Sequence, residues 1–410
     1  MRKELILLIF LLVWGIWIIY TVNQDIIYPG IYVEDIALGG LTLQEAQKKL
    51  QDYERKLLQE NALTLYYGEE KVTVTYQEIG VTYDRISALQ RAYQVGRTRD
   101  WLENYLVICS LKKKPKVFPL KISNSEENIY SLLEKMKNNF EQKPKDAIIQ
   151  RNQQQFIVTE EIIGRRLNIP KTAEKIQQKV KQRQGGMLEV VLEDWVPKYI
   201  GDQLKQIQYP IGSFTTYFDS EEIMRTANIQ KAAQSINGVI LGPEELFSAQ
   251  KSLGEITKEQ GYVDAPIILN GELIPGVGGG VCQVTTTLYN AVLLSELHVV
   301  ERKNHSLPVR YVPLGRDAAY ATGWLDFKFK NNTQGPLYVE SIVKENELQV
   351  TIYGTIQKDT TRKIELMSRI EEGENTEYLS VKLYKQVYEK DQLIEEILVN
   401  TSHYKPKPSS

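Results

Sequence analysis

The sequence predicts an α+β protein with one N-terminal transmembrane helix, two small α+β modules and a mixed α/β domain whose C-terminal part is rich in strands. Three features predict this class: an apolar run at residues 5–24, two matching strand-turn-helix patterns within residues 28–200, and a glycine turn before a helical pattern near residue 282. The 410 residues, 42% apolar and 25% charged, are enough for two or three folded domains. The 50 basic and 52 acidic residues are balanced, which argues against a nucleic-acid partner.

The apolar run at residues 5–24 is predicted to span a membrane. It carries no formal charge, and its first 18 residues are almost wholly apolar, which is just long enough to cross a bilayer. Two basic residues precede the run and Asp25 follows it, so residues 1–4 are expected in the cytoplasm and the bulk of the chain outside. The alternative is a cleaved signal peptide, but residues 20–27 lack a small-x-small cleavage site. A single-pass anchor in the cell membrane is therefore favoured.

The chain has two cysteines, Cys109 and Cys282, in a compartment that permits disulfides. One bridge between them is an open alternative to two free thiols. A disulfide scaffold is excluded, because a chain of this length needs no covalent staples and two thiols cannot form a framework.

Residues 28–200 contain a repeated pattern. The string Val-Thr-x-x-x-Ile-Gly occurs at residues 74–80 and again at residues 158–164, and Asp84 and Asn168 follow at the same offset. Each copy combines an alternating strand, a glycine turn and a helix, which predicts two small α+β modules. Two coincidental strand-turn-helix units are the alternative.

A third domain is predicted to begin near residue 210, because a stretch with proline, glycine, glutamine and lysine breaks the periodicity just before it. Beyond residue 324 apolar and polar residues alternate, as at Leu325, Phe327 and Phe329, which is typical of strands. A β-rich extension is expected over residues 356–404, and the tail at residues 405–410 is expected to be disordered.

The most informative stretch is Pro-Gly-Val-Gly-Gly-Gly-Val-Cys-Gln-Val-Thr-Thr-Thr-Leu-Tyr-Asn-Ala at residues 275–291. Three consecutive glycines can adopt backbone angles closed to other residues. Residues at helical spacing follow, which places Cys282 at or just before a helix N-terminus. The positive dipole end there favours a thiolate, and N–H groups near Gly280 and Gln283 could hold a developing oxyanion. The alternative is a small buried cysteine that packs like alanine.

A cysteine nucleophile commonly needs an imidazole as base and a third polar group that orients it. His305, on a predicted loop, is the best base candidate; Asp317 is the best orienting carboxylate, with Asn304 as substitute. Arg316 and Arg302 are candidates for holding a substrate carboxylate. The alternatives are a loop histidine bonded to the backbone and arginines in structural ion pairs.

Other chemistries have little support in the sequence. There is no HExxH motif, no CxxC motif and no histidine-rich cluster, so no metal site is expected. The three glycines form neither a P-loop nor a GxGxxG motif, so no nucleotide cofactor is expected.

Several separated blocks of sequence resemble the VanW domain over residues 210–355. They include Arg-Thr-Ala-Asn at 225–228, Gly-Gly-Gly-Val-Cys-Gln-Val-Thr-Thr-Thr at 278–287, Asn-His-Ser at 304–306 and Gly-Arg-Asp-Ala at 315–318. Residues 28–200 resemble, less closely, the peptidoglycan-binding module that often precedes VanW domains and also accompanies L,D-transpeptidases. The family takes its name from an accessory gene of glycopeptide-resistance clusters.

This resemblance implies an extracytoplasmic bacterial cell-wall protein whose partners are peptidoglycan stem peptides. It also implies that Cys282 is the nucleophile of an L,D-transpeptidase that forms 3-3 crosslinks through a thioester, with Thr285 and Thr286 as further substrate-binding candidates. Water as acceptor would make the protein a carboxypeptidase. A function of another class is also open: a non-catalytic peptidoglycan-binding envelope protein with a structural VanW domain and an inert Cys282.

Overall fold

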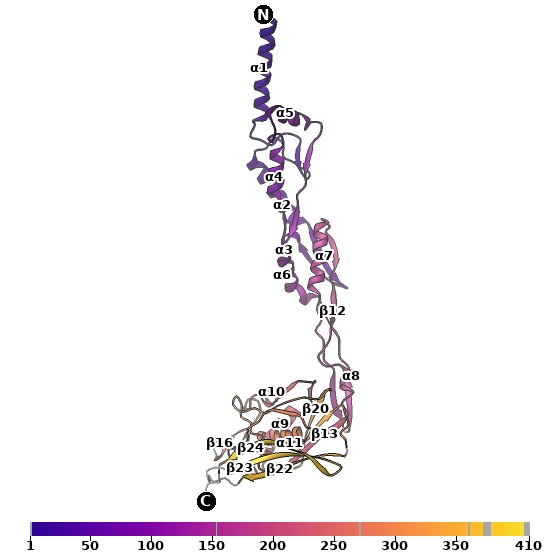
Figure 1. Cartoon of the computed structure of the whole chain (residues 1–410), viewed down its shortest axis with the longest axis vertical. Helices are drawn as coiled ribbons and strands as arrows, with labels where there is room; N and C mark the ends of the chain where they lie inside the picture. The colour runs from indigo at the N-terminus through magenta and orange to yellow at the C-terminus, as the bar shows by residue number, and fades with distance from the viewer. Residues whose placement is uncertain (1, 153, 270–271, 360, 372–378, 406–410) are drawn as a thin grey trace. The chain divides into compact units, whose positions relative to one another are not determined.

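The computed structural model describes residues 2–152, 154–269, 272–359, 361–371 and 379–405. Residues 406–410, in the tail predicted to be disordered, lie outside the described residues. Helices make up 33% of the chain and strands 34%, in several small sheets, so the predicted α+β class is confirmed. The chain divides into unit 1, Met1–Pro144 with Ile163–Val196, and unit 2, Lys145–Ile162 with Pro197–Ser410 (Figure 1).

Unit 1 combines the N-terminal helix with short strands and helices around one core. Its elements are α1 (Arg2–Val22), β1 (Ile31–Val33), β2 (Ile36–Ala37), α2 (Leu43–Glu60), β3 (Ala62–Tyr67), β4 (Glu70–Thr75), α3 (Tyr76–Ile79), β5 (Val81–Tyr83), α4 (Arg85–Gln94), α5 (Trp101–Ser110), β6 (Lys116–Phe118), β7 (Ile122–Asn124), α6 (Glu126–Met136), a 3-10 turn (Lys137–Asn139), β10 (Gly164–Leu167), α7 (Ile169–Lys181), β11 (Gly186–Glu189) and β12 (Leu192–Trp195). The strands form the sheets β2-β1-β6, β11-β3-β4, β5-β7 and β10-β12. The parallel pairing of β3 with β11 joins strands that lie far apart in the sequence.

The two copies of the repeated string differ in structure before a capped helix: the first contains α3 between β4 and β5, whereas the second runs from β9 to β10 without a helix and is divided between unit 2 and unit 1. Gly80 ends α3 with a φ of +77°, and β5 follows it; Gly164 begins β10 in the second copy. Asp84 caps α4 and Asn168 caps α7, each by accepting a hydrogen bond from the N–H group three residues further on. Such caps satisfy N–H groups that a helix start leaves free.

The N-terminal helix α1 is long and apolar enough to cross a membrane. It has 21 residues and a mean hydropathy of 2.7 over its most apolar window. Its side chains are mostly exposed; Ile18 and Val22, in the last two turns, are buried in the core of unit 1. A signal sequence near the N-terminus can also form an apolar helix of this kind.

Unit 2 contains the hairpin between the two segments of unit 1 and the remainder of the chain. Its elements are β8 (Ile148–Asn152), β9 (Gln155–Thr159), α8 (Gly201–Leu204), β13 (Tyr209–Tyr217), α9 (Ile223–Ile236), β14 (Val239–Leu241), β15 (Leu246–Ser248), α10 (Ala249–Leu253), β16 (Asp264–Leu269), β17 (Glu272–Val277), α11 (Val281–Leu294), β18 (His298–Glu301), β19 (Lys328–Lys330), β20 (Leu337–Lys344), β21 (Glu347–Gly354), β22 (Arg362–Glu371), β23 (Leu379–Glu389) and β24 (Gln392–Tyr404). The smaller sheets are β8-β9, β15-β19-β18 and β16-β17.

The four-stranded sheet β13-β21-β20-β14 carries the main core of unit 2. All its pairings are antiparallel, and two helices pack on it: α11 contacts β13 and β21, while α9 contacts β20 and α11. Every residue of α11 except Cys282 and Leu294 is buried. A helix buried on all sides belongs to the core, so Cys282 occupies one of the accessible positions of an otherwise enclosed helix.

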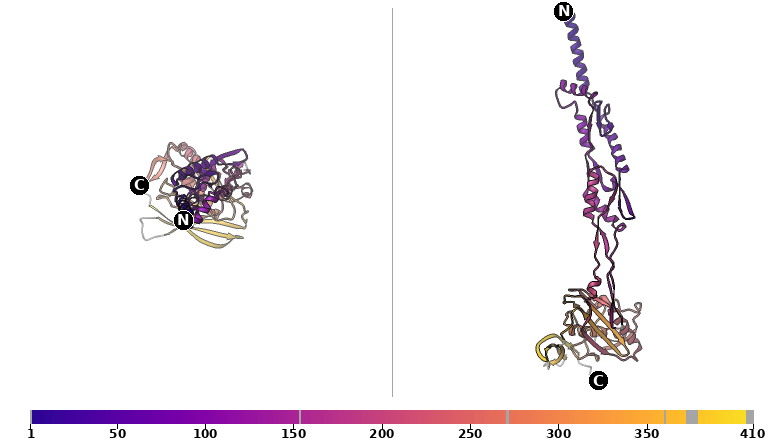
Figure 2. Two further views of the ribbon diagram at one scale, coloured as in Figure 1. Left: turned by 90° about the horizontal axis from the view of Figure 1, so that it is seen from above. Right: turned by 90° about the vertical axis from the view of Figure 1, so that its right-hand side faces the viewer.

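The three long strands β22, β23 and β24 form a further antiparallel sheet in unit 2 (Figure 2). Leu383 on β23 belongs to the same apolar core as α11. Most residues of β24 are exposed, but Ser402 and Tyr404 near its end are buried. These two polar side chains bond to residues of the segment that joins β18 to β19. The C-terminal sheet therefore supports that segment.

Candidate active site

A tight glycine turn determines where α11 begins. Gly278 and Gly280 have φ angles of +83° and +108°, in the left-handed region that favours glycine. A Cβ on Gly279 would lie 2.6 Å from the Pro266 carbonyl oxygen, and one on Gly280 would lie 2.8 Å from a side chain of α9. The turn therefore has no room for side chains at these glycines. It ends where α11 begins, and Cys282 is the second residue of that helix.

The Cys282 thiol is partly exposed and lies against the backbone of Tyr320. The Tyr320 N–H donates to Sγ at 3.4 Å, and Sγ lies 3.4 Å from the Tyr320 carbonyl oxygen. An N–H group aimed at sulfur stabilises the thiolate. Cys109 and Cys282 are both free, so no bridge joins them in this structure.

His305 is buried beside Cys282, and its ring hydrogen bonds to the thiol. Burial raises the pKa of the Cys282 thiol, but the charge and hydrogen bond of His305 and the Tyr320 N–H outweigh it and hold the pKa below its ordinary value. Burial lowers the pKa of His305, but the thiolate charge and the bond to Asp317 raise it to about 10. Both shifts favour a thiolate and imidazolium pair.

Asp317 holds the far side of the imidazole. Its Oδ2 lies 2.7 Å from His305 Nδ1 and also accepts the His305 backbone N–H at 2.6 Å. This contact leaves Nε2 for the thiol. The carboxylate is 1% exposed. Burial raises the pKa of Asp317, yet its bond to His305 and the neighbouring positive charges keep the pKa below its usual range, so the group is an anion that orients the ring.

The other carboxylate oxygen, Oδ1, is held by two residues. It accepts the Tyr404 hydroxyl at 2.5 Å and the Arg302 guanidinium at 3.2 Å. Arg302 also donates to the Gly315 and Asp317 carbonyl oxygens and to Ser402 Oγ. The guanidinium is thus occupied by internal partners in the support of Asp317. This geometry matches the structural ion pair and not the substrate contact expected for Arg302.

Arg316 lies elsewhere. Its Nε donates to Asn290 Oδ1 at 2.8 Å, and its guanidinium carbon lies 4.8 Å from the centre of the Phe214 ring. Asn290 follows Cys282 by eight residues on α11, which corresponds to about 12 Å along the helix. The structure therefore does not bring the Arg316 guanidinium to the thiol.

Asn304, Thr285 and Thr286 hold backbone segments in place. The Asn304 amide donates to the carbonyl oxygens of His305 and His403, and therefore ties the histidine loop to β24; it does not replace Asp317 at the ring. Both threonine hydroxyls are buried and bond to the Ala318 backbone. They therefore fix the segment between Asp317 and Tyr320 against α11.

The Gln283 N–H and side chain, predicted near the oxyanion, are already used in other hydrogen bonds. The Gln283 N–H already donates to the Gly280 carbonyl oxygen at 3.0 Å, so it closes the turn. The Gln283 side chain donates to Thr216 and Tyr217 and accepts from Arg225, which fastens the start of α11 to β13 and α9. Among the described residues, the N–H group of Cys282 itself donates to no backbone acceptor. That group is the better candidate donor.

Sequence reasoning missed three contributors: the Tyr404 hydroxyl, the Tyr320 backbone and the Tyr311 phenol. Burial, the Cys282 thiolate and Asp317 raise the pKa of Tyr311, and a hydrogen bond to Thr286 and the charge of Arg225 only partly oppose this. Tyr311 therefore stays protonated near the thiol. These contributions depend on contacts between residues far apart in the sequence, so no local pattern marked them.

Two family models match the chain. Residues 224–353 match "VanW like protein", and residues 72–188 match "Putative peptidoglycan binding domain". The two resemblances predicted from the sequence are therefore confirmed. The strands β22 to β24, which support Asp317 through Tyr404, lie outside both matches.

Two curated proteins are similar to the chain. YoaR of Bacillus subtilis is 37% identical over 193 residues, which cover 46% of this chain and 64% of that protein. The vancomycin B-type resistance protein VanW of Enterococcus faecalis is 27% identical over 142 residues, 33% of this chain and 52% of that protein. The chain thus spans less than two thirds of the length of either relative. No solved structure matches the chain significantly.

Proposed function

We propose that this chain, which carries a VanW-like domain after a peptidoglycan-binding domain, is a membrane-anchored cysteine L,D-transpeptidase of the bacterial cell wall. The observation that carries the proposal is the triad of Cys282, His305 and Asp317, in which a partly exposed thiol contacts an imidazole held by a buried carboxylate. The two domains together indicate a cell-wall-associated protein. The triad adds a nucleophile, an acid-base group and an orienting anion to it.

The first half of the reaction transfers an acyl group to sulfur. The Cys282 thiolate attacks the carbonyl carbon that joins the third stem residue to D-Ala. The carbonyl π electrons move to oxygen, and the resulting oxyanion is stabilised by main-chain N–H groups such as that of Cys282. When the C–N bond breaks, the His305 imidazolium gives its proton to the departing amine. D-Ala leaves, and a thioester with a neutral imidazole remains.

The second half restores the enzyme. Neutral His305 takes a proton from the side-chain amine of a diamino acid on a neighbouring stem as this amine attacks the thioester carbonyl. The C–S bond breaks and its electron pair returns to sulfur, so the thiolate and imidazolium pair is regenerated and a 3-3 crosslink is formed. With water as the acceptor, the same steps would release a tripeptide stem.

Charge balance explains why the supporting residues matter to this scheme. Asp317 compensates the imidazolium before acylation and keeps Nε2 aimed at the sulfur. Arg302 and Tyr404 bond to the carboxylate and so prevent it from rotating away from His305. Because the lowered pKa of the Cys282 thiol favours the thiolate, acylation depends less on a separate deprotonation step.

The proposed location follows from α1. Its 21 residues and mean hydropathy of 2.7 suit a single membrane span, and the positive residues before it favour a cytoplasmic N-terminus. In this orientation the peptidoglycan-binding and VanW-like domains face the cell wall, where stem peptides are found.

The deciding experiment is intact mass spectrometry of the full chain in detergent micelles, incubated with a disaccharide-tetrapeptide. Wild type should show a thioester adduct, released D-Ala and crosslinked dimer, and Cys282→Ser should show none of these. Cys109→Ser is the matched control and should behave as wild type. A wild-type protein that forms no adduct and no product, yet sediments with purified sacculi, would establish the non-catalytic binding protein instead.

A further inference from the structure

The helix α5 exposes an apolar stripe that nothing in unit 1 covers. Asn104 and Ile108 face inward and are 8% and 9% exposed. On the opposite side Leu102 and Leu106, one helical turn apart, are 43% and 60% exposed, and Trp101 at the helix start is 54% exposed. The exposed Cys109 continues the stripe one turn later. An aqueous surface rarely groups such side chains on one short helix.

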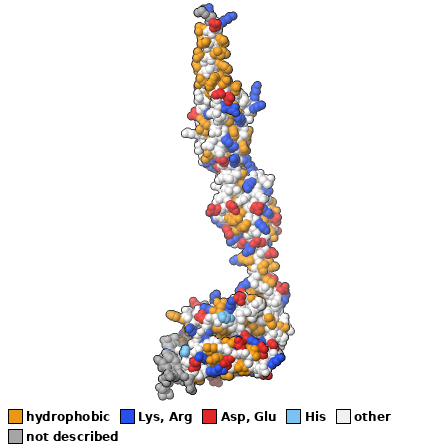
Figure 3. Space-filling view, viewed as in Figure 1, with side chains coloured by type: hydrophobic (Ala, Val, Ile, Leu, Met, Phe, Trp, Pro, Cys, Tyr) orange, Lys and Arg blue, Asp and Glu red, His pale blue; other side chains and the backbone are white. Residues whose placement is uncertain are grey.

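This helix lies directly beside the end of α1. α5 contacts α1, and the rings of Trp17 and Tyr105 meet edge to face with centroids 5.7 Å apart. In the space-filling view the apolar side chains of α1 give way at this level to mixed apolar and charged side chains (Figure 3). The stripe therefore continues from the apolar surface of the candidate membrane span.

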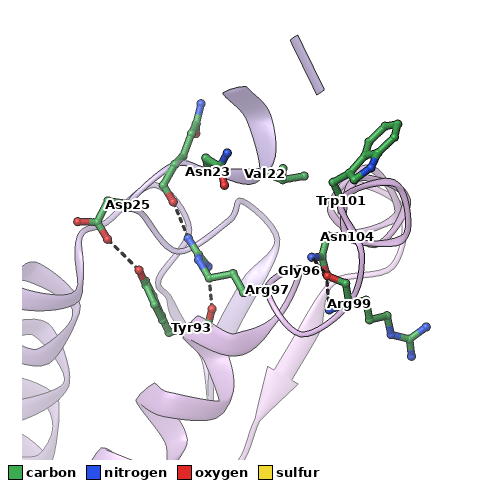
Figure 4. Close-up of a pocket in the computed structure, with 10 residues that line it drawn as sticks. Val22, Asn23, Asp25, Tyr93, Gly96, Arg97, Arg99, Trp101 and Asn104 are labelled. Atoms are coloured by element: carbon green, nitrogen blue, oxygen red, sulfur yellow. Dashed lines mark hydrogen bonds between the residues drawn. The ribbon is translucent and has the colours of Figure 1, made fainter. Parts of the chain in front are cut away.

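A network of hydrogen bonds makes the end of α1 rigid with respect to unit 1. The Tyr28 hydroxyl donates to the Val22 carbonyl oxygen, and Tyr93 donates to Asp25, both at 2.7–2.8 Å. Arg97 donates to the carbonyl oxygens of residues 24 and 26. Figure 4 shows Arg97 beside Tyr93 and the bond between Tyr93 and Asp25. Together with the buried Ile18 and Val22, these bonds fix the level of α5 along α1.

The length of α1 then determines the depth of α5. A helix of 21 residues is about 31 Å long, and the hydrocarbon core of a bilayer is about 30 Å thick. Crossing the core therefore uses nearly all of α1. Trp17 is five residues, or about 7–8 Å, from the end of the helix. A contact at Trp17 thus lies about 7–8 Å inside the outer edge of the hydrocarbon core, within the depth of about 5–10 Å that the apolar face of an interfacial helix reaches.

The charge of the segment after α5 also favours a membrane surface as its partner. The residues after α5 include Lys112, Lys113, Lys114 and Lys116, all exposed, and no acidic residue lies among them. Lysines at headgroup level attract anionic lipids, roughly fivefold in binding for each lysine near the surface. An apolar stripe followed by a basic segment is the pattern of a helix that lies in a membrane interface.

We infer that α5 and the lysine segment form an interfacial membrane contact, in which Leu102, Leu106 and Cys109 enter the outer boundary of an anionic bilayer. The contact rests on the proposed anchor, because α1 sets its depth. Its effect is to hold unit 1 against the membrane at a second point, so that unit 1 cannot swing freely about the end of α1.

The native Cys109 provides the test. The full chain with Cys282→Ser, labelled at Cys109 with an environment-sensitive fluorophore, is reconstituted into vesicles of phosphatidylglycerol and phosphatidylethanolamine. We expect blue-shifted emission, quenching by lipids with a quencher at a shallow acyl position, and protection from aqueous iodide. The matched control places the label on α6 of unit 1, as Lys135→Cys in a chain lacking both native cysteines, and should be quenched by iodide alone.

Two variants and one separate measurement distinguish the possible failures. Leu102→Glu with Leu106→Glu changes exposed residues, so the chain should fold but lose most of the lipid quenching. Glutamine at the four lysines should reduce the quenching in anionic vesicles only. Flotation with vesicles after alkaline extraction tests whether α1 is inserted in the membrane. A chain that floats while its Cys109 label stays exposed to water overturns the interfacial contact but keeps the proposed anchor. A chain that does not float overturns both, and protection that appears only at high protein density would assign the stripe to a second copy.

Discussion

Cys109 and Cys282 are both free and both lie on apolar helices, but their surroundings differ in three respects. Cys282 lies in the first turn of α11, where N–H groups point outward, whereas Cys109 lies in the last turn of α5, where carbonyl groups do. Cys282 contacts His305, whereas Cys109 hydrogen bonds to Tyr105. Cys282 also receives a backbone N–H, from Tyr320. The comparison teaches that a reactive thiol is made by its neighbours, since both side chains are accessible.

The largest effect should come from Cys282→Ser, and Cys109→Ser is the matched control. Cys282→Ser should lower D-Ala release from tetrapeptide by roughly 10³-fold or more, because the nucleophile is lost. Cys109→Ser should leave the rate within a factor of two of wild type. The assay is D-Ala release at saturating tetrapeptide. Equal losses in the two variants would contradict the assignment of Cys282 as the nucleophile.

The second effect concerns the imidazole and its pH dependence. His305→Gln should lower turnover about 10²- to 10⁴-fold, because the acid-base group is lost. Alkylation of Cys282, measured against pH in a Cys109→Ser background, should also change. Wild type has a lowered thiol pKa, so its rate should reach a plateau below the ordinary value of 9.0. Without His305, burial prevails, and the midpoint should move above that value.

A control for this prediction lies at high pH. The pKa of His305 is raised to about 10, so turnover that needs the imidazolium should fall as the pH rises through about 10. Alkylation needs only the thiolate and should not fall there. A midpoint that stays in place in His305→Gln would show that the imidazole does not set the pKa of the thiol.

The third effect concerns Asp317, which orients His305 and balances the charge of Arg302. Asp317→Asn should lower turnover on the order of 10²-fold, less than the loss of His305. It also leaves the Arg302 guanidinium, which is 6% exposed, without its buried partner, and this should reduce the free energy of unfolding by about 3–5 kcal/mol. Thermal melting and turnover are to be measured on the same preparation. Unchanged melting would mean that Arg302 is not tied to Asp317.

The smallest effect tests the contribution of the C-terminal sheet. Tyr404→Phe removes the hydroxyl that bonds to Asp317 and to the Gly315 N–H, which should cost about 1–3 kcal/mol of stability. Turnover should fall by about tenfold, and the alkylation midpoint of Cys282 should shift to higher pH, because a less firmly held Asp317 supports His305 less well. A merely structural tyrosine would change the melting temperature and leave the midpoint in place.

The sequence indicated the parts of the site that depend on local pattern. Three glycines before a helical pattern suffice to place Cys282 at a helix start, and the apolar run suffices to place α1. His305 and Asp317 were singled out as base and orienting group because few other polar residues of these types follow the motif, and the structure brings them together. Their catalytic roles stay predictions.

Other features of the site depend on contacts between distant residues, which leave no local pattern. Tyr404 is separated from Asp317 by 87 positions, and β24, which carries it, has no motif that marks its inward face. Arg302 and Arg316 were expected to contact substrate, because a sequence does not reveal whether a guanidinium faces solvent or a buried partner. Here their partners are Asp317 and Asn290.

The position of Tyr404 also has a consequence for how the protein is made. Ribosomes extend a chain at about 5–20 residues per second, and Cys282 and His305 are synthesised well before β24. In the proposed orientation, the thiol therefore reaches the outside before the strand that completes the hydrogen bonds of Asp317. A nascent chain carries an incompletely supported triad, and completion of the proposed site coincides with the arrival of its last strand.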